Sequence, residues 1–333
     1  MGRRLGRKQL GAAVGGLLAA ESVYIAAHIM PDGDAVGSML GLGTALSRLG
    51  KACTLACADP VPPKFDYVDG FARVVSRPPT TETVIISVDS SDIERLGSLY
   101  DAAIFASRPV INIDHHVTNT GYGSINLVQV VPSTAEIVLS LVKRLGVKLD
   151  RSIATALLTG LVTDTRCFRT GNVTSRQLRV ALELTRSGAS LAEVTELIFN
   201  REPIATVCLW GRALANVGRR GRILWTEIDR RLIGECQAAP NDDKGLVSFL
   251  ASRADVDVAI VFRETDDGRI EASMRSGPGW DVSRAALQLG GGGHPRAAGC
   301  TRPGPMASAR EFVLSRVAES LEAQEAARAE ESH

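Results

Sequence analysis

The first half of the chain contains four short apolar runs that are rich in branched residues and do not alternate with polar ones. They are SVYIAAHI (22–29), ACTLACA (52–58), TVIISVDSS (83–91) and VINID (110–114). Alternation disappears when both faces of a strand are covered, as in a parallel sheet between helices. The segment GSMLGLGTALSRLG (37–50) has helical spacing and a closing glycine. The pattern predicts an α/β fold with a doubly wound, mostly parallel sheet.

The chain has 333 residues, which is too long for one ordinary domain, so we expect two. From Ser133 the spacing becomes helical, and strand-like segments return at RILWTEI, VDVAIVFRE and RIEASMRS. The predicted parts are a first domain at 1–190, a helical linker at 191–221, a smaller α/β domain at 222–325 and a frayed tail at 326–333.

Composition excludes several classes of protein. The net charge of +1 offers no strongly basic surface, so tight binding of long duplex nucleic acid is not expected. No run of about 18 uninterrupted apolar residues occurs, which argues against a membrane span. The six cysteines have neither paired nor zinc-type spacing, and we expect Cys53 and Cys57 to be small buried residues. A reducing cytoplasm is the expected location.

Acidic and histidine side chains stand where three of the strands and one apolar helix end. HIMPDGD follows the first strand, VDSSD ends the third, IDHH ends the fourth, and LVTDT ends the helix. The carboxyl ends of parallel strands meet at one edge of a sheet, where such folds bind their ligands. The sequence therefore predicts one site containing His28, Asp32, Asp34, Asp89, Asp114, His115, His116 and Asp164.

This site would hold more negative charge than a buried cluster tolerates. Asp32, Asp34, Asp89 and Asp164 would repel one another, and burial would penalise each carboxylate further. Two divalent cations would neutralise them, with His28 and His115 as neutral ligands. Because oxygen ligands predominate beside imidazole, we favour Mn²⁺ among the candidate ions.

In this combination and order, the motifs closely resemble those of the DHH phosphoesterases. Specifically, they resemble the DHH–DHHA1 subfamily of bifunctional oligoribonucleases (nanoRNases) and phosphoadenosine phosphatases. HIMPDGDAVGS, SVDSSDIERLG, IDHH and LVTDT are similar to the four motifs of the first domain. SMRS and GGGGHPRAAG are similar to the DHHA1 signature, so the resemblance covers nearly the whole chain.

The resemblance implies an active-site cleft between the two domains and a role for each site residue. His28 and Asp32 would bind the first metal, and Asp89 would bridge to a second metal held by Asp34, His115 and Asp164. Asp114 would orient His115, and His116 would reach the substrate phosphate or the attacking water. Relatives carry glycine or a small or apolar residue where this chain has Arg166, which we expect to be a solvated surface residue rather than a substrate contact.

The run GGGGHPRAAG suggests a phosphate-binding loop in the second domain. Consecutive glycines expose backbone N–H groups and let a phosphate approach closely. An arginine at the end of the strand RIEASMRS can bind phosphate through two hydrogen bonds or stack on a base. The predicted substrate-binding residues are Arg275, Gly291, Gly292, Gly293, His294 and Arg296.

The implied activity is metal-dependent hydrolysis of phosphate esters. We expect cleavage of short oligoribonucleotides to mononucleotides and of 3′-phosphoadenosine 5′-phosphate to AMP and phosphate. An alternative is a phosphodiesterase for cyclic di-AMP or its linear product pApA. A non-catalytic nucleotide sensor is an alternative of another class, although a sensor would not need the complete ligand set. The family also suggests a homodimer.

Overall fold

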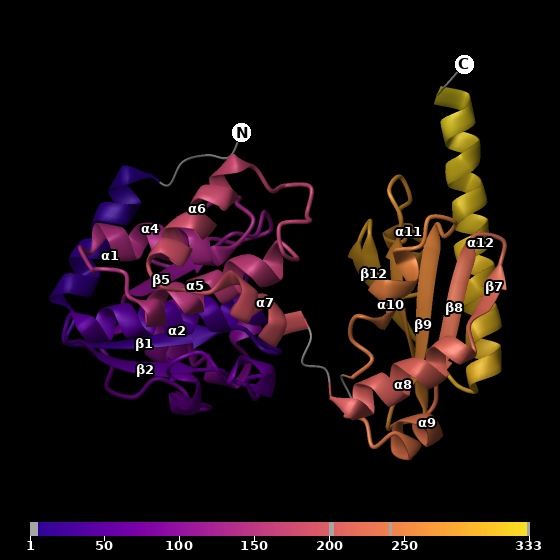
Figure 1. The fold of residues 1–333 in the computed structure, drawn as a ribbon, viewed down its shortest axis with the longest axis horizontal. Coiled ribbons are helices and arrows are strands. Elements are labelled where there is room, and N and C mark those ends of the chain that lie inside the picture. The colour runs from indigo at the N-terminus through magenta and orange to yellow at the C-terminus, as the bar shows by residue number, and fades with distance from the viewer. Residues whose placement is uncertain (1–5, 200–202, 240–241, 332–333) are drawn as a thin grey trace. The chain divides into compact units, whose positions relative to one another are not determined.

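The computed structural model describes residues 6–199, 203–239 and 242–331 of the chain (Figure 1). They divide into two compact units, Met1–Arg201 and Glu202–His333. Each unit is built around its own six-stranded sheet. The predicted α/β class, with a smaller second domain, is confirmed.

The sheet of the first unit is entirely parallel, and its strands follow the order 3-2-1-4-5-6. All four predicted strands are present. The two edge strands are not predicted by the sequence, because they are short and only partly buried. In spatial order the strands are β3 (Val74–Val75), β2 (Ala52–Ala56), β1 (Ser22–Ala27), β4 (Val84–Val88), β5 (Val110–Asp114) and β6 (Ile125–Val128).

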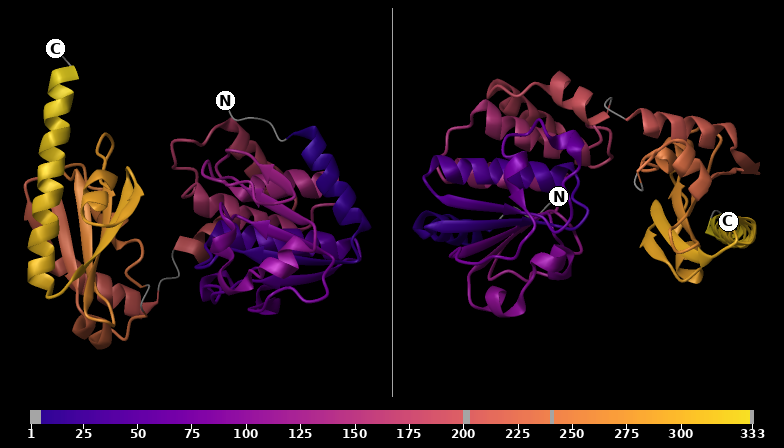
Figure 2. Two further views of the ribbon diagram at one scale, coloured as in Figure 1. Left: turned by 180° about the vertical axis from the view of Figure 1, so that it is seen from behind. Right: turned by 90° about the horizontal axis from the view of Figure 1, so that it is seen from below.

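Helices cover both faces of this sheet (Figure 2). Side chains of the central strands alternate between two hydrophobic cores, one on each face. In β1, Val23 and Ile25 join the larger core, whereas Tyr24 joins the smaller one. The smaller core is closed by η3 (Ile93–Leu99) and α3 (Ala102–Ala106). The larger core is closed by α1 (Arg7–Ala19), α2 (Gly33–Arg48), α4 (Thr134–Arg144), α5 (Arg151–Asp164), α6 (Ser175–Arg186) and α7 (Leu191–Phe199).

Two glycines allow α2 and α5 to pack with their backbones in close contact. A Cβ on Gly37 would overlap the carbonyl oxygen of Ala156. A Cβ on Gly160 would lie 2.5 Å from an oxygen of Asp34. Neither position accepts a larger residue without movement of a helix, so the glycines determine how closely α5 approaches α2.

The second unit has a mixed sheet with helices on both faces. The helices are α8 (Ile204–Ala215), α9 (Arg230–Glu235), α10 (Leu246–Ala251), α11 (Ser283–Gln288) and α12 (Met306–Glu331). One core lies under α11 and α12, and the other lies under α8 and α10. The strand order is β11 (Gly292–His294), β12 (Ala297–Pro303), β10 (Arg269–Ser276), β9 (Val258–Glu264), β8 (Ile223–Ile228) and β7 (Gly218–Arg220).

Two segments differ from what the sequence suggests. The stretch predicted as a linker, 191–221, contributes α7 to the first unit, where it packs on α5, and α8 to the second. The stretch predicted as a frayed tail, 326–333, continues α12 as far as Glu331, and its last two residues lie outside the described chain. Across the described ranges, no helix combines the length and apolar character needed to cross a membrane.

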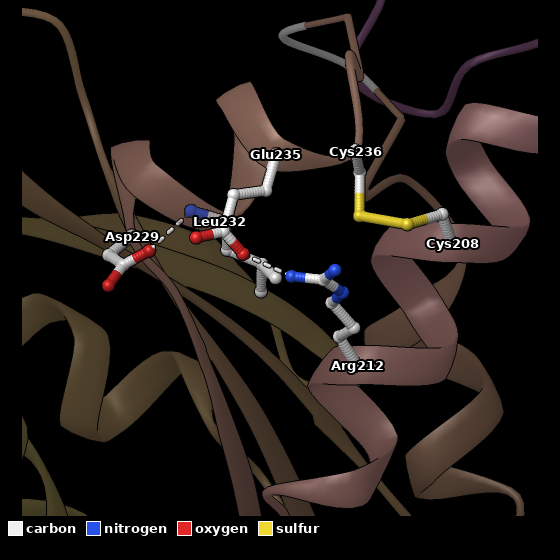
Figure 3. Close-up of a disulfide and its surroundings, with 6 residues drawn as sticks. All are labelled: Cys208, Arg212, Asp229, Leu232, Glu235 and Cys236. Atoms are coloured by element: carbon white, nitrogen blue, oxygen red, sulfur yellow. Dashed lines mark hydrogen bonds and ion pairs between the residues drawn. A yellow bond between two sulfur atoms is a disulfide. The ribbon is translucent and has the colours of Figure 1, made fainter.

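A disulfide joins Cys208 of α8 to Cys236, which follows α9 (Figure 3). The sequence does not predict it, because the two residues are 28 positions apart and share no motif. An ion pair between Arg212 and Glu235 lies beside the bond, so α8 and α9 are joined by charge as well as by sulfur. Cys53 and Cys57 are free thiols; Cys57 is buried as expected, whereas Cys53 is only half-buried.

Replacing both disulfide cysteines with serine should destabilise the second unit. Closing a loop of 28 residues removes chain entropy from the unfolded state and stabilises by roughly 3–4 kcal/mol. Scanning calorimetry of Cys208→Ser/Cys236→Ser should show the melting of this unit lowered by roughly 10–20 °C. The first unit should melt unchanged.

Cys53→Ser is the matched control, because it replaces a free, half-buried thiol in the other unit. A reducing agent should lower the midpoint of the wild type and leave that of the double variant unchanged. Equal midpoints for the wild type and double variant under oxidising conditions would show that the bond does not form.

Candidate metal centre and substrate-binding hairpin

The candidate site lies where β1 and β4 run side by side in the centre of the first sheet. The chain leaves β1 toward α2 on one face and leaves β4 toward η3 on the other. The divergence opens a crevice at the carboxyl ends of the two strands, which is where doubly wound folds bind ligands. His28 directly follows β1, and Asp89 directly follows β4.

The predicted metal ligands come together in the structure. Within the described chain, ligand atoms of His28, Asp32 and Asp89 all lie within 4.8 Å of one another. Two further groups also have all their ligand atoms within 4.8 Å of one another. The third group shares Asp89 with the first group and His115 with the second. The second group is Asp34, His115 and Asp164, and the third is Asp89, His115 and His116. These groups could hold metal.

Asp89 stands between the first and second groups. Its Oδ2 is 3.7 Å from Nε2 of His28, and its Oδ1 is 3.5 Å from Nε2 of His115. The side chain is 1% exposed, and its backbone has φ of 58°, a conformation that non-glycine residues adopt at a cost. Its N–H nevertheless donates to the carbonyl of Ile113, at 2.9 Å. The ladder between β4 and β5 therefore fixes the strained residue.

Asp34 is fully buried, and the start of α4 provides its hydrogen-bond donors. The backbone N–H groups of Thr134 and Ala135 donate to its two oxygens at 2.5 and 3.0 Å. An anion at a helix N-terminus is also favoured by the helix dipole. The hydroxyl of Thr134 donates to Asp89 at 2.8 Å, so one residue supports both carboxylates. No motif in the sequence marks Thr134 as part of the site.

The pKa values of the buried carboxylates show that the site lacks positive charge. Burial, followed by the charge of Asp89, holds the pKa values of Asp34 and Asp164 well above the usual range. Burial also disfavours the ionised form of Asp89, but its interaction with the nearby His28 and the proximity of His115 outweigh burial and lower the pKa of Asp89 to about 2. Full ionisation of the site therefore requires additional positive charge.

Both histidine ligands have their second ring nitrogen next to a backbone carbonyl. Nδ1 of His28 is 2.6 Å from the carbonyl oxygen of Ile29, and Nδ1 of His115 is 2.9 Å from that of Val131. A proton on each Nδ1 leaves the lone pair of Nε2 directed at the carboxylates, which is the tautomer that a metal requires. The guanidinium of Arg95, which also has no motif that predicts it, lies 3.2 Å from Nδ1 of His28.

Asp114 positions a different histidine from the one predicted. Its Oδ1 accepts a hydrogen bond of 2.7 Å from Nδ1 of His116 rather than from His115. Its Oδ2 accepts from the amide of Asn119, also at 2.7 Å. The buried carboxylate raises the pKa of His116 through this hydrogen bond. Asp114 therefore favours a protonated His116 at the rim of the site.

Arg166 is exposed, two residues beyond Asp164. It opens a run of three non-glycine residues with positive φ, which ends at Phe168. Its charge lowers the pKa of Asp164 but is outweighed by burial. The exposed position agrees with the expected surface arginine.

In the second unit, the predicted phosphate-binding loop is a tight hairpin. Gly292, Gly293 and His294 form β11, which pairs with β12 through a two-residue turn of Pro295 and Arg296. A Cβ on Gly291 would overlap the carbonyl of Gly299 in β12. Gly291 and Gly293 are thus required by close strand packing, in addition to any role toward a ligand, whereas a Cβ on Gly292 would meet no atom within 4 Å.

The hairpin aligns His294 with Arg275. His294 is paired with Ala297 of β12, which is paired in turn with Arg275 of β10. Paired residues share a face of the sheet, so the two basic side chains project from the same face, about 10 Å apart. Arg296 lies in the turn, with Nε 3.5 Å from the carbonyl of Ser276. The structure thus groups the three predicted basic residues at one end of this sheet.

Comparisons with known proteins agree with both halves of this description. The profile of the DHH family, N-terminal domain, matches residues 22–161, and that of the DHHA1 domain matches residues 234–323. The bifunctional oligoribonuclease and PAP phosphatase NrnA of Thermus thermophilus is 36% identical over 309 residues, which are 90% of either chain. The protein of the same name from Bacillus subtilis is 25% identical over 84% of this chain and 89% of its own.

Solved structures support the fold. An exopolyphosphatase-related protein from Bacteroides fragilis superposes with a TM-score of 0.89 at 21% identity, covering 97% of this chain and 99% of its own. RecJ of Thermus thermophilus, solved with Mn²⁺, gives a TM-score of 0.52 at 14% identity over 95% of this chain and 54% of its own. The profile matches and the relative from Thermus establish that the chain belongs to the DHH family, with a DHH domain followed by a DHHA1 domain.

Proposed function

We propose that the protein is a metal-dependent phosphoesterase. It hydrolyses short oligoribonucleotides to mononucleotides and 3′-phosphoadenosine 5′-phosphate to AMP and phosphate. The observation that carries the proposal is the placement of Asp89, whose two oxygens face two ligand groups from the end of one strand. The relative from Thermus, named for both activities and 36% identical, supports the choice of substrates.

The residues of the site fit two divalent cations, and we propose Mn²⁺. His28 and Asp32 would hold one ion and Asp34, His115 and Asp164 the other, with Asp89 between them. Mixed carboxylate and imidazole ligation suits Mn²⁺, and two dipositive ions would offset the charges that raise the pKa values of Asp34 and Asp164. The ions would supply a nucleophile at neutral pH and stabilise the charge that develops on phosphorus oxygens.

The remaining residues bind and orient the substrate. His116, protonated and fixed by Asp114, donates a hydrogen bond to the phosphate or a proton to the departing oxygen. In the second unit, Arg275, His294 and Arg296 with the backbone of Gly291, Gly292 and Gly293 bind a second group of the substrate. A binding surface this small suits substrates of a few nucleotides and needs no long basic track.

One alternative is hydrolysis of cyclic di-AMP or pApA. A cyclic-di-AMP phosphodiesterase, GdpP of Geobacillus thermodenitrificans, is 30% identical over 65% of this chain. That match covers only 32% of the relative, and so it is weaker support than the 90% coverage of NrnA. A non-catalytic nucleotide sensor is less compatible with a site in which all six predicted ligands converge.

Purified protein supplied with Mn²⁺ should hydrolyse short RNA and 3′-phosphoadenosine 5′-phosphate with higher kcat/KM than cyclic di-AMP. We expect this order of substrates from the geometry of the ligand groups and from the activities for which the relatives are named. The measurement is product release on all three substrates, in parallel and in competition. Preference for cyclic di-AMP would establish the alternative, and binding without turnover of any substrate would establish the sensor.

Removing the charge of Asp89 should abolish metal binding while preserving the fold. Saturating a wild-type site with Mn²⁺ at about 100 times Kd stabilises by about 2.7 kcal/mol, which raises the melting temperature of the first unit. Asp89→Asn has nearly the same shape but loses the charge that faces both groups, so most of this rise should disappear. Differential scanning calorimetry with and without Mn²⁺ measures it directly.

Asp101→Asn is the matched control, since Asp101 caps α3 away from the ligand groups and asparagine caps equally well. This variant should keep the full Mn²⁺-dependent rise. A full rise in Asp89→Asn as well, together with wild-type turnover, would refute the bridging role of Asp89.

Arg275→Ala should raise KM by roughly 10–100-fold, because hydrogen bonds between a guanidinium and a phosphate are charge-assisted. His294→Ala should act in the same direction, and neither change should abolish the Mn²⁺-dependent rise in melting temperature. Arg269→Ala, at the other end of β10 and on the same face, is the control for removing an arginine from this strand. If Arg275→Ala and Arg269→Ala gave equal KM values on every substrate, the assignment of Arg275 would be wrong.

A further inference from the structure

A pocket of about 420 Å³ lies beside the metal centre, in the first unit, and none of the roles above uses it. It is formed by the segment that follows β2 and by the segment that leads into β3. Most of its wall is apolar, and Asp59 is its charged residue, with no lysine or arginine among the lining residues. The apolar wall includes Pro60, Val61, Phe71, Ala72, Val74 and Val75.

The pocket opens at the same edge of the sheet as the metal ligands. β2 is the direct neighbour of β1, and both are parallel, so their carboxyl ends lie side by side. Contacts join the two sites: the thiol of Cys57 donates to the carbonyl of His28 at 3.2 Å. Asp59 accepts a hydrogen bond of 2.7 Å from the backbone N–H of Met30.

The segment between the two sites is under backbone strain. Met30 has φ of 50°, and its side chain is 63% exposed, which is unusual for a large apolar residue. One oxygen of Asp59 holds this conformation, and the other accepts no hydrogen bond among the described residues. Strained residues that the surroundings hold in place concentrate at ligand sites.

We propose that this pocket binds the nucleoside adjoining the phosphate that is cleaved, a proposal that rests on the function proposed above. The base occupies the apolar part, and the second oxygen of Asp59 accepts a hydrogen bond from a ribose hydroxyl. Asp59 is the third residue after β2 in a sheet of order 3-2-1-4-5-6. In nucleotide-binding domains with this order, a carboxylate beyond the second strand binds the ribose; we use the position as an analogy.

The chemistry of the pocket selects against other occupants. A phosphate would meet the negative charge of Asp59 without a lining cation to offset it. A base presents a flat apolar face of the kind that Phe71, Val74 and Val75 can cover. A carboxylate acceptor also gives a preference for ribose over deoxyribose, because only ribose carries a 2′-hydroxyl donor.

Filling the pocket tests the site for the base. Ala72→Trp should raise KM for 3′-phosphoadenosine 5′-phosphate by about tenfold, the size of one lost base contact. KM for ribose 3,5-bisphosphate, which lacks the base, should change less than about twofold. Ala103→Trp, an exposed alanine of α3 outside both sites, is the matched control and should change neither. Equal effects of Ala72→Trp on both substrates would overturn the proposal.

The proposed contact of Asp59 with the sugar is tested by the enzyme's preference for ribose over deoxyribose. Asp59→Asn keeps an oxygen for Met30 but loses the carboxylate offered to the sugar. The ratio of kcat/KM for 3′-phosphoadenosine 5′-phosphate over its 2′-deoxy analogue should fall several-fold. The Mn²⁺-dependent rise in melting temperature should persist. An unchanged ratio would remove Asp59 from sugar recognition.

Photolabelling separates this proposal from the proposed function, because it requires no turnover. Irradiating the wild-type protein with 8-azido-AMP should label peptides within residues 57–76, and Ala72→Trp should suppress the labelling. Labelling confined to other segments would refute the pocket even if the enzyme proved active. Labelling here by a protein that hydrolyses neither short RNA nor 3′-phosphoadenosine 5′-phosphate would support the pocket and refute the proposed function.

Discussion

The mutual repulsion of carboxylates around Asp34 is the constraint on which the first unit depends. Asp34 is fully buried, and the charge of Asp89 adds to the effect of burial on its pKa. A chain that only needed a stable core would place an apolar residue here. The fold instead directs the first N–H groups of α4 at Asp34 and leaves Gly160 without a side chain where its oxygen lies. These features maintain a charge that becomes favourable only when cations are bound.

Backbone strain in the first unit is concentrated near the same carboxylates. Within the described residues, the non-glycine positions with positive φ in the first unit are Met30, Asp89 and the three consecutive residues from Arg166 to Phe168. Met30 lies two residues beyond the ligand His28, Asp89 is itself a ligand, and the run from Arg166 begins just after Asp164. A strained residue persists only where its surroundings determine it, and here hydrogen bonds to Asp59 and Ile113 do so. Strain therefore marks the site as clearly as charge does.

The sequence predicts well which residues form the site, but it predicts less well which of their atoms form hydrogen bonds. Three ligand-bearing motifs directly follow strands, and parallel pairing alone brings their side chains to one edge. The hydrogen bond from His116 to Asp114 depends on side-chain torsions, which spacing does not reveal, so Asp114 was expected to serve His115. The disulfide depends on the packing of α8 against α9, and the GGGGH run on register within a sheet. Neither the packing of two helices nor the register of a hairpin can be deduced from the residue pattern alone.

The carboxylates of the site are held in place in two different ways, by strand hydrogen bonds or by helix packing. Asp89 and Asp114 are fixed by ladder hydrogen bonds, from the N–H of Asp89 to Ile113 and from that of Gln129 to Asp114. Asp164 stands at the end of a helix, so its position depends on how deeply α5 sits against α2, and glycines set that depth. A methyl group at Gly37 would overlap the carbonyl oxygen of Ala156, so it would displace α5 and separate Asp164 from Asp34 without touching any ligand. The geometry of the metal centre is therefore encoded partly in residues that have no side chain.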